Sequence, residues 1–99
     1  MRNEPENCKS IEEVRFEIDS IDNEIIRLIA LRGDYVKAAA KFKTDKNSVK
    51  ANDRVKTMID KRRQWATDLA INPNFIESQF RSMVQYFIDI EMEEWESKN

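Results

Sequence analysis

Three charged residues fall where the helical pattern of this 99-residue sequence expects apolar side chains. Arg32 interrupts the apolar seam of the first predicted helix. Lys43 lies eleven residues later, about three turns on, and returns to nearly the same face. Glu91 interrupts the apolar stripe of the last predicted helix. Because a buried charge is costly unless it meets an opposite charge, the pattern indicates an internal ion network, for example Arg32 with Glu91, or a binding site for an anion.

Arg15 adds a third cation on the first predicted helix. It precedes Arg32 by seventeen residues, which is about 25 Å along a helix and about 100° away around it. Two such residues of one chain cannot line the same pocket. Two long helices packed antiparallel in a dimer could bring Arg15 of one chain to Arg32 of the other. The alternative is that Arg15 is a solvent-exposed arginine.

The composition excludes several kinds of site. The sequence contains no histidine and a single cysteine, Cys8. A Cys/His zinc site, a Ser-His-Asp triad and a disulfide within one chain are therefore excluded, and we expect no metal. Without a histidine to activate its thiol, Cys8 is interpreted as incidental.

Charge and hydropathy limit the partners. The net charge of −2 gives no basic excess that would favour nucleic acid. The basic run of Lys61, Arg62 and Arg63 is interpreted as a solvated helix face. No apolar run approaches the about 20 residues of a membrane span, and the N-terminus lacks the apolar core of a signal peptide. We expect a cytoplasmic protein that binds no membrane.

The first element is predicted to be a long helix. Ser10 followed by Glu13 forms a capping box, which marks a helix start. Apolar residues then alternate at spacings of three and four in a heptad seam: Ile11, Val14, Ile18, Ile21, Ile25, Leu28, Tyr35, Ala39 and Phe42. A helix from residue 11 to about 43 would be about 50 Å long. Since nothing else in so short a chain can cover that length, the seam predicts a partner chain.

Two further helices follow a polar loop over residues 44–51. Asn52 or Asp53 can cap the second helix. Asn72 with Pro73 provides a cap and a first-turn proline for the third. The sequence therefore predicts an all-α fold with three helices per chain, in a single domain of residues 1–99 of which residues 1–9 are flexible.

Together these features resemble the all-α chorismate mutases, and most closely their isochorismate-pyruvate lyase members. The resemblance covers nearly the whole chain. It rests on Arg15, the segment RGDYVKAA (32–39), FK (42–43), RV (54–55), WA (65–66), YFI (86–88), Glu91 and Trp95.

The resemblance implies an intertwined homodimer with two equivalent sites that use no cofactor. Arg32, and Arg15 of the partner chain, would bind the two carboxylates of the substrate. Lys43 would contact the ether oxygen and a carboxylate, and Arg54 would line the site. Glu91 occupies the position at which many members of the family have a glutamine that donates a hydrogen bond to the ether oxygen.

The implied chemistry suits these residue types. Chorismate and isochorismate are dianions with an enolpyruvyl ether, and their pericyclic reactions require no nucleophile. A guanidinium can bind a carboxylate through two parallel hydrogen bonds. A fixed ammonium stabilises the negative charge that grows on the ether oxygen as its carbon–oxygen bond stretches.

Glu91 departs from the family pattern, because an ionised carboxylate cannot donate a hydrogen bond. Either Glu91 is protonated in the site, or it points elsewhere and Lys43 acts alone. The expected activity is an isochorismate-pyruvate lyase with secondary chorismate mutase activity. The alternatives are a dedicated mutase of chorismate or an amino-chorismate, and a non-catalytic helical dimer that regulates a partner.

Overall fold

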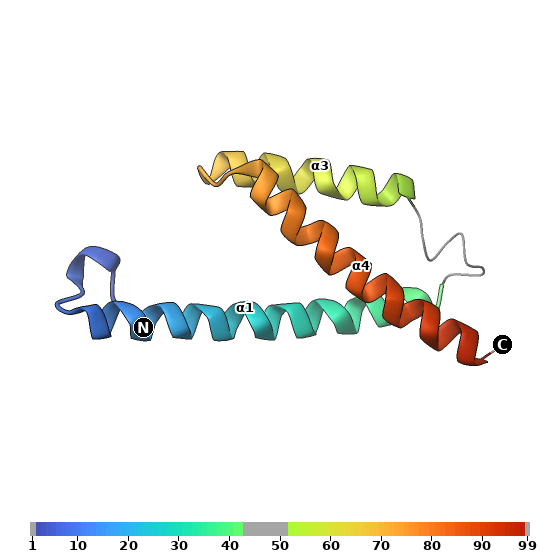
Figure 1. Ribbon diagram of the computed structural model, residues 1–99, viewed down its shortest axis with the longest axis horizontal. Coiled ribbons are helices and arrows are strands. Elements are labelled where there is room, and N and C mark those ends of the chain that lie inside the picture. Colours follow the sequence, from blue (N-terminus) through green and yellow to red (C-terminus); the bar gives the residue numbers. More distant parts are fainter. Residues whose placement is uncertain (1, 43–51, 99) are drawn as a thin grey trace. The chain divides into compact units, whose positions relative to one another are not determined.

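The computed structural model describes residues 2–42 and 52–98, and within these ranges all regular secondary structure is helical. A short 3-10 helix, η1 (Pro5–Asn7), precedes the α-helices α1 (Ile11–Ala40), α3 (Asn52–Asp68) and α4 (Pro73–Lys98) (Figure 1). The three predicted helices are therefore confirmed in these parts of the chain. The chain divides into two compact units, Met1–Tyr35 and Val36–Asn99.

In the first unit, α1 begins at the predicted capping box. The backbone N–H of Glu13 donates to Ser10 Oγ at 3.1 Å, which satisfies one of the donors that a helix start leaves open. The Glu13 carboxylate in turn accepts the backbone N–H of Lys9 at 2.5 Å. In the usual capping box this carboxylate accepts the N–H of the cap residue itself, which here is Ser10. In this chain it accepts the N–H of the residue before the cap. Both bonds fix the direction in which the chain enters α1.

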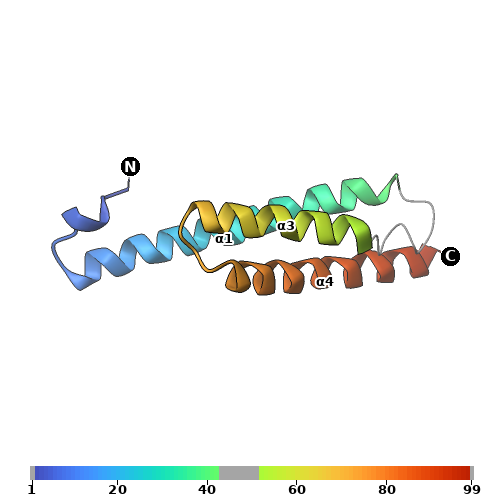
Figure 2. The same cartoon turned by 90° about the horizontal axis from the view of Figure 1, so that it is seen from above.

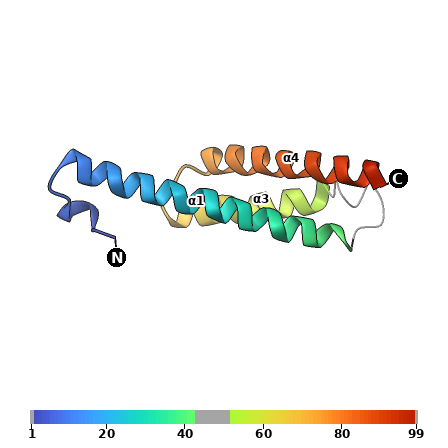
Figure 3. The ribbon, with the colours of Figure 1, turned by 90° about the horizontal axis from the view of Figure 1, so that it is seen from below.

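The residues before α1, here called the N-terminal arm (residues 2–10), fold back along the first turns of that helix (Figure 3). Arg2 forms an ion pair with Glu24. The backbone N–H of Asn3 donates to Glu17 Oε2 at 2.5 Å. The arm thus contacts side chains that follow it by 14 and 22 residues.

In the second unit, the chain reverses between α3 and α4 through a left-handed residue. Ala70 has φ 59°. The N–H of Ile71 donates to the carbonyl of Ala66 at 2.8 Å, and that of Ala70 donates to Thr67 at 3.1 Å. These two bonds are the Schellman pattern that closes a helix C-terminus. The helix stops here because a left-handed residue cannot continue it.

The start of α4 matches its prediction. Asn72 Oδ1 accepts the backbone N–H of Asn74 at 2.8 Å, and Pro73 is the first helical residue. The short connection makes α3 and α4 an antiparallel hairpin (Figure 2). The hairpin buries an apolar core of Met58, Ile59, Ala66 and Phe87.

An arginine takes part in the packing of the hairpin. The Arg62 guanidinium carbon lies 5.1 Å from the ring centre of Trp65 on the same helix. It lies 5.3 Å from that of Phe80 on α4. Arg62 Nη1 also donates to the Met58 carbonyl at 3.1 Å. Arg62 and Arg63 are both half-buried, so the prediction of a solvated basic face holds for Lys61 but is wrong for the two arginines.

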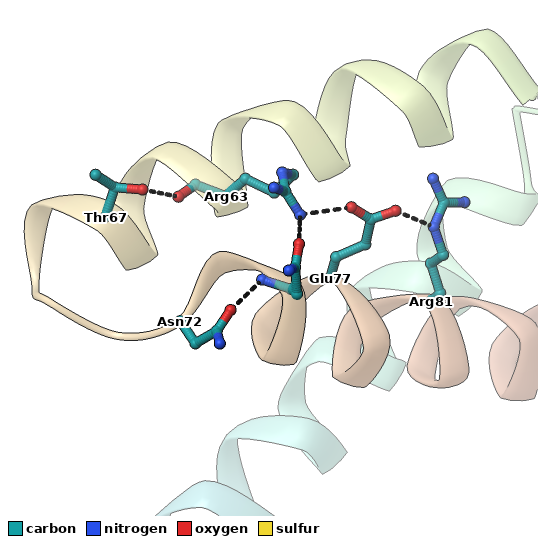
Figure 4. Close-up of polar contacts among 6 residues, drawn as sticks. Arg63, Thr67, Asn72, Glu77 and Arg81 are labelled. Carbon is teal, nitrogen blue, oxygen red and sulfur yellow. Dashed lines mark hydrogen bonds and ion pairs between the residues drawn. The ribbon is translucent and has the colours of Figure 1, made fainter.

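A second polar contact joins the two helices near the turn (Figure 4). Arg63 Nη1 donates to Glu77 Oε1 at 2.8 Å and to Asn74 Oδ1 at 3.0 Å. Arg81 Nε donates to the other oxygen of Glu77 at 2.6 Å. The hydrogen bond from Arg81 lowers the pKa of the Glu77 carboxyl, burial opposes this shift, and the charges of both arginines add to it.

This network predicts a pH dependence of stability. The pKa of Glu77 is lower in the folded chain than in the unfolded chain. The ionised carboxylate therefore stabilises the fold fully at pH values above its pKa in the unfolded chain, and this stabilisation is lost as the pH falls through its pKa in the folded chain. We expect Glu77→Gln to lower Tm modestly at pH 7. Between pH 7 and pH 3, the Tm of this variant should fall by less than the Tm of the wild type does. Thermal melts followed by circular dichroism measure both.

A matched control for this prediction is Asp89→Asn. Asp89 is an exposed α4 carboxylate that accepts a hydrogen bond from Gln85 at 2.8 Å, a neutral donor. If Asp89→Asn alters the acid limb of Tm as much as Glu77→Gln does, the arginine network is not its source.

Candidate active site

Arg15 and Arg32 lie on one continuous helix, which keeps them apart. Both fall within α1, which runs unbroken from Ile11 to Ala40. The helical rise places them about 25 Å apart along the axis. The side chain of Arg15 is exposed, and that of Arg32 is half-buried. The prediction that the two arginines of one chain cannot share a pocket follows directly from this geometry.

Arg54 and Glu91 are brought to the same end of the α3–α4 hairpin. Arg54 lies in the first turn of α3, and Glu91 lies two turns before the end of α4. Because the two helices are antiparallel, the start of α3 and the last part of α4 both lie at the end away from the turn, where the two helices diverge (Figure 1). Arg54 is exposed, whereas Glu91 is only 6% exposed.

The burial of Glu91 fits the predicted place of this residue in an apolar stripe. Phe87, one turn earlier on the same face of α4, is 9% exposed. A carboxyl group on this face is excluded from most of the solvent. Such a group can act as a hydrogen-bond donor when protonated and only as an acceptor when ionised. Within the hairpin, Glu91 therefore supplies a buried carboxyl group on α4, and Arg54 supplies a cation at the same end of the hairpin.

Lys43, the residue expected to contact the ether oxygen, lies outside the described residues. The structure also gives no group of three or more His, Cys, Asp or Glu residues that could hold a metal ion within residues 2–42 and 52–98. In the same ranges, none of the helices combines the length and apolar character that crossing a bilayer demands.

Cys8 fits its interpretation as an incidental residue. Its side chain is half-buried and donates weakly to the Glu4 carbonyl at 3.8 Å. Burial raises the pKa of the Cys8 thiol, and the charges of Glu13 and Glu17 raise it further. The thiol form therefore dominates at neutral pH, and thiols are poor nucleophiles compared with thiolates.

The polar contacts of the hairpin were not anticipated from the sequence. Arg62 and Arg63 belong to a basic run whose pattern favours solvent. One local signal was available for Arg62, since Trp65 follows three residues later, on the same face of a helix. The partners on α4, Phe80 and Glu77, are distant in sequence and could be found only once the hairpin was known.

Comparison with known proteins identifies the family. The family model described as chorismate mutase type II matches residues 14–92, which include Arg15, Arg32, Lys43, Arg54 and Glu91. The chain is also 33% identical over 91 residues to a protein of Pseudomonas aeruginosa named isochorismate pyruvate lyase. The aligned part covers 92% of this chain and 90% of that relative. With its helical fold and the match over most of its length, the chain belongs to the chorismate mutase type II family.

Proposed function

We propose that this protein is an isochorismate pyruvate lyase that forms salicylate and pyruvate and has a weaker chorismate mutase activity. The observation that carries the proposal is the 33% identity with the Pseudomonas aeruginosa isochorismate pyruvate lyase over nearly the full length of both chains. In this reaction the ether carbon–oxygen bond breaks, a ring hydrogen moves to the methylene carbon of the enolpyruvyl group, and the ring becomes aromatic. A dedicated mutase fits the family match equally well, but the named relative favours the lyase.

The experiment that tests the proposal is product analysis after the pure protein receives chorismate and isochorismate separately. We expect salicylate and pyruvate from isochorismate, and slower formation of prephenate from chorismate. Prephenate formation with no salicylate would identify a dedicated mutase. A protein that converts neither substrate would instead be a non-catalytic helical dimer.

The proposed site uses five residues. Arg32 and the partner subunit's Arg15 bind the two carboxylates, which suits guanidinium groups because they can form paired hydrogen bonds. Lys43 donates to the ether oxygen, Arg54 lines the site, and Glu91 is the fifth residue. This arrangement holds the substrate in a compact conformer and requires no cofactor. The family match over residues 14–92 supports the assignment, since it spans all five positions.

The proposed assembly is an intertwined homodimer in which both units of each chain form one domain. The seam of α1 supports this proposal, because Ile18, Ile21, Ile25 and Leu28 are 39–62% exposed in the single chain. A continuous apolar seam of this kind is unfavourable in water and typically marks an interface.

The dimer proposal predicts a mass in solution of about twice the 11.8 kDa chain mass, measured by light scattering at micromolar concentration. Ile25→Asp should move the mass toward a single chain and abolish activity, because it places a charge in the seam. Asn23→Asp adds the same charge to an exposed polar position of α1 and should leave the mass unchanged. A stable, active monomer of the wild type would overturn the dimer.

For Glu91 we propose that its side chain lies against the ether oxygen, at the position where many members of the family have a glutamine that donates a hydrogen bond. An amide can donate to that oxygen, whereas an ionised carboxylate can only accept. If the site uses a donor here, Glu91→Gln should retain or increase kcat. Steady-state kinetics on isochorismate at pH 7 measure kcat for both proteins.

The matched control is Glu93→Gln, which neutralises an exposed carboxylate two residues away on α4 and should keep the wild-type kcat. An inactive Glu91→Gln beside an active Glu93→Gln would show that the Glu91 carboxylate itself is required. Glu91 would then position Lys43 or an arginine rather than donate to the substrate.

A further inference from the structure

The N-terminal arm is attached to α1 on both sides of Arg15 in the sequence. Its three acceptors on the helix are Glu13, Glu17 and Glu24, which accept Lys9 N–H, Asn3 N–H and the Arg2 guanidinium respectively. Their spacings of four and seven residues place them on one face of α1. The arm and this face border a shallow polar hollow lined by Arg2, Phe16, Glu17, Ser20 and Glu24.

Arg15 occupies a part of α1 that would otherwise be weakly held. It is the fifth residue of the helix, and the first turns of a helix fray because their N–H groups lack partners within the helix. Glu13 and Glu17 precede and follow Arg15 by two residues each, so the arm fixes the backbone on either side of it. Helical geometry turns Arg15 about 160° from Glu17, which leaves its side chain clear of the arm.

We propose that the N-terminal arm is a positioning segment for Arg15, holding the first turns of α1 in the geometry in which this arginine binds a substrate carboxylate of the partner subunit's site. The inference rests on the proposed function. Binding groups must be held closely to be effective, and supporting contacts supply that order. The arm provides these supporting contacts without covering the apolar seam of α1, because Glu17 and Glu24 lie beside the seam residues and not among them.

Electrostatics support the same arrangement. The arm sets Arg2 against Glu24, and it places Cys8 near enough to Glu13 and Glu17 for their charges to raise the pKa of its thiol. The ion pair is solvent-exposed, with 39% of Arg2 and 58% of the Glu24 side chain accessible. Exposed pairs of this kind are weak and are screened by salt. The expected effect of the arm on binding is therefore modest and depends on ionic strength.

The test uses the full-length variant Glu17→Ala/Glu24→Ala, which removes both distant attachment points of the arm. We expect KM to rise about two- to fivefold with kcat within about twofold of the wild type, because carboxylate binding acts in the ground state and the transition state alike. Asn23→Ala is the matched control. It removes the acceptor of an Arg27 hydrogen bond of 2.6 Å on the same helix, a bond that does not attach the arm, and should leave KM unchanged.

A double-mutant cycle shows whether the arm acts through Arg15. The two arm substitutions are added to Arg15→Ala, and kcat/KM is measured at high enzyme concentration. They should cause no further loss of kcat/KM in this background. The same fold-loss in both backgrounds, or an unchanged KM in the arm variant, would overturn the positioning role while the enzyme stays a lyase. Absence of turnover by the wild type would instead refute the proposed function, so the two failures are distinct. The reversed pair Arg2→Glu/Glu24→Arg should restore KM relative to either single reversal.

Discussion

Lys43→Ala should lower kcat by about 10²–10³, the usual effect of removing one donor that stabilises a developing charge. The ammonium of Lys43 is proposed to strengthen its contact with the ether oxygen only as the carbon–oxygen bond stretches. Such an interaction lowers the barrier more than it improves substrate binding. KM should therefore change much less than kcat, and steady-state kinetics on isochorismate measure both.

The control for Lys43 is Lys41→Ala. Lys41 is exposed, carries the same charge and lies two residues earlier, so it separates a specific contact from a general loss of positive charge. Both variants should melt at the wild-type temperature. If the two lysines have equal effects, or if Lys43→Ala raises KM alone, Lys43 acts in binding and another group stabilises the ether oxygen.

Mixing two inactive variants should restore activity if each site takes residues from two chains. Arg15→Ala and Arg32→Ala should each be nearly inactive, because each site loses one carboxylate ligand. A mixed dimer of the two carries one site in which both arginines are intact. Random exchange of subunits makes about half of the dimers mixed, so about a quarter of the wild-type activity should return.

The control mixture pairs Arg15→Ala with the double variant Arg15→Ala/Arg32→Ala. No combination of these chains contains an intact site, so subunit exchange should restore nothing. If the first mixture stays as inactive as its parents although exchange is confirmed by mass spectrometry, Arg15 and Arg32 do not meet across the dimer. Equal recovery in both mixtures would contradict the assignment in the same way.

The helices could be predicted because local side chains determine where they begin. Ser10 and Asn72 accept backbone N–H groups at the predicted starts of α1 and α4. The end of α1 was predicted about three residues late: the helix ends at Ala40, and Lys41 and Phe42 continue it only through shorter-range turns. Apolar periodicity continues to Phe42, and no glycine or proline lies between Gly33 in the middle of the helix and that point.

The buried position of Glu91 could also be predicted, because its apolar neighbours repeat at helical spacing. The spacing of Arg15 and Arg32 likewise follows from the length of α1. The contacts of Arg2 with Glu24 and of Arg63 with Glu77 could not be predicted. They join polar residues that are 14 to 22 positions apart, and polar side chains carry no periodic signal that indicates which partners will meet.

The proposal that this chain is an isochorismate pyruvate lyase is tested most directly by comparing kcat/KM for isochorismate and chorismate in one preparation. Protein carrying Lys43→Ala, purified identically, shows how much activity comes from contaminating enzymes. We predict a higher kcat/KM for isochorismate, with salicylate and pyruvate formed in equal amounts and the activity lost in the variant. A higher kcat/KM for chorismate with prephenate as product, or an equal rate in the variant, would contradict the proposal.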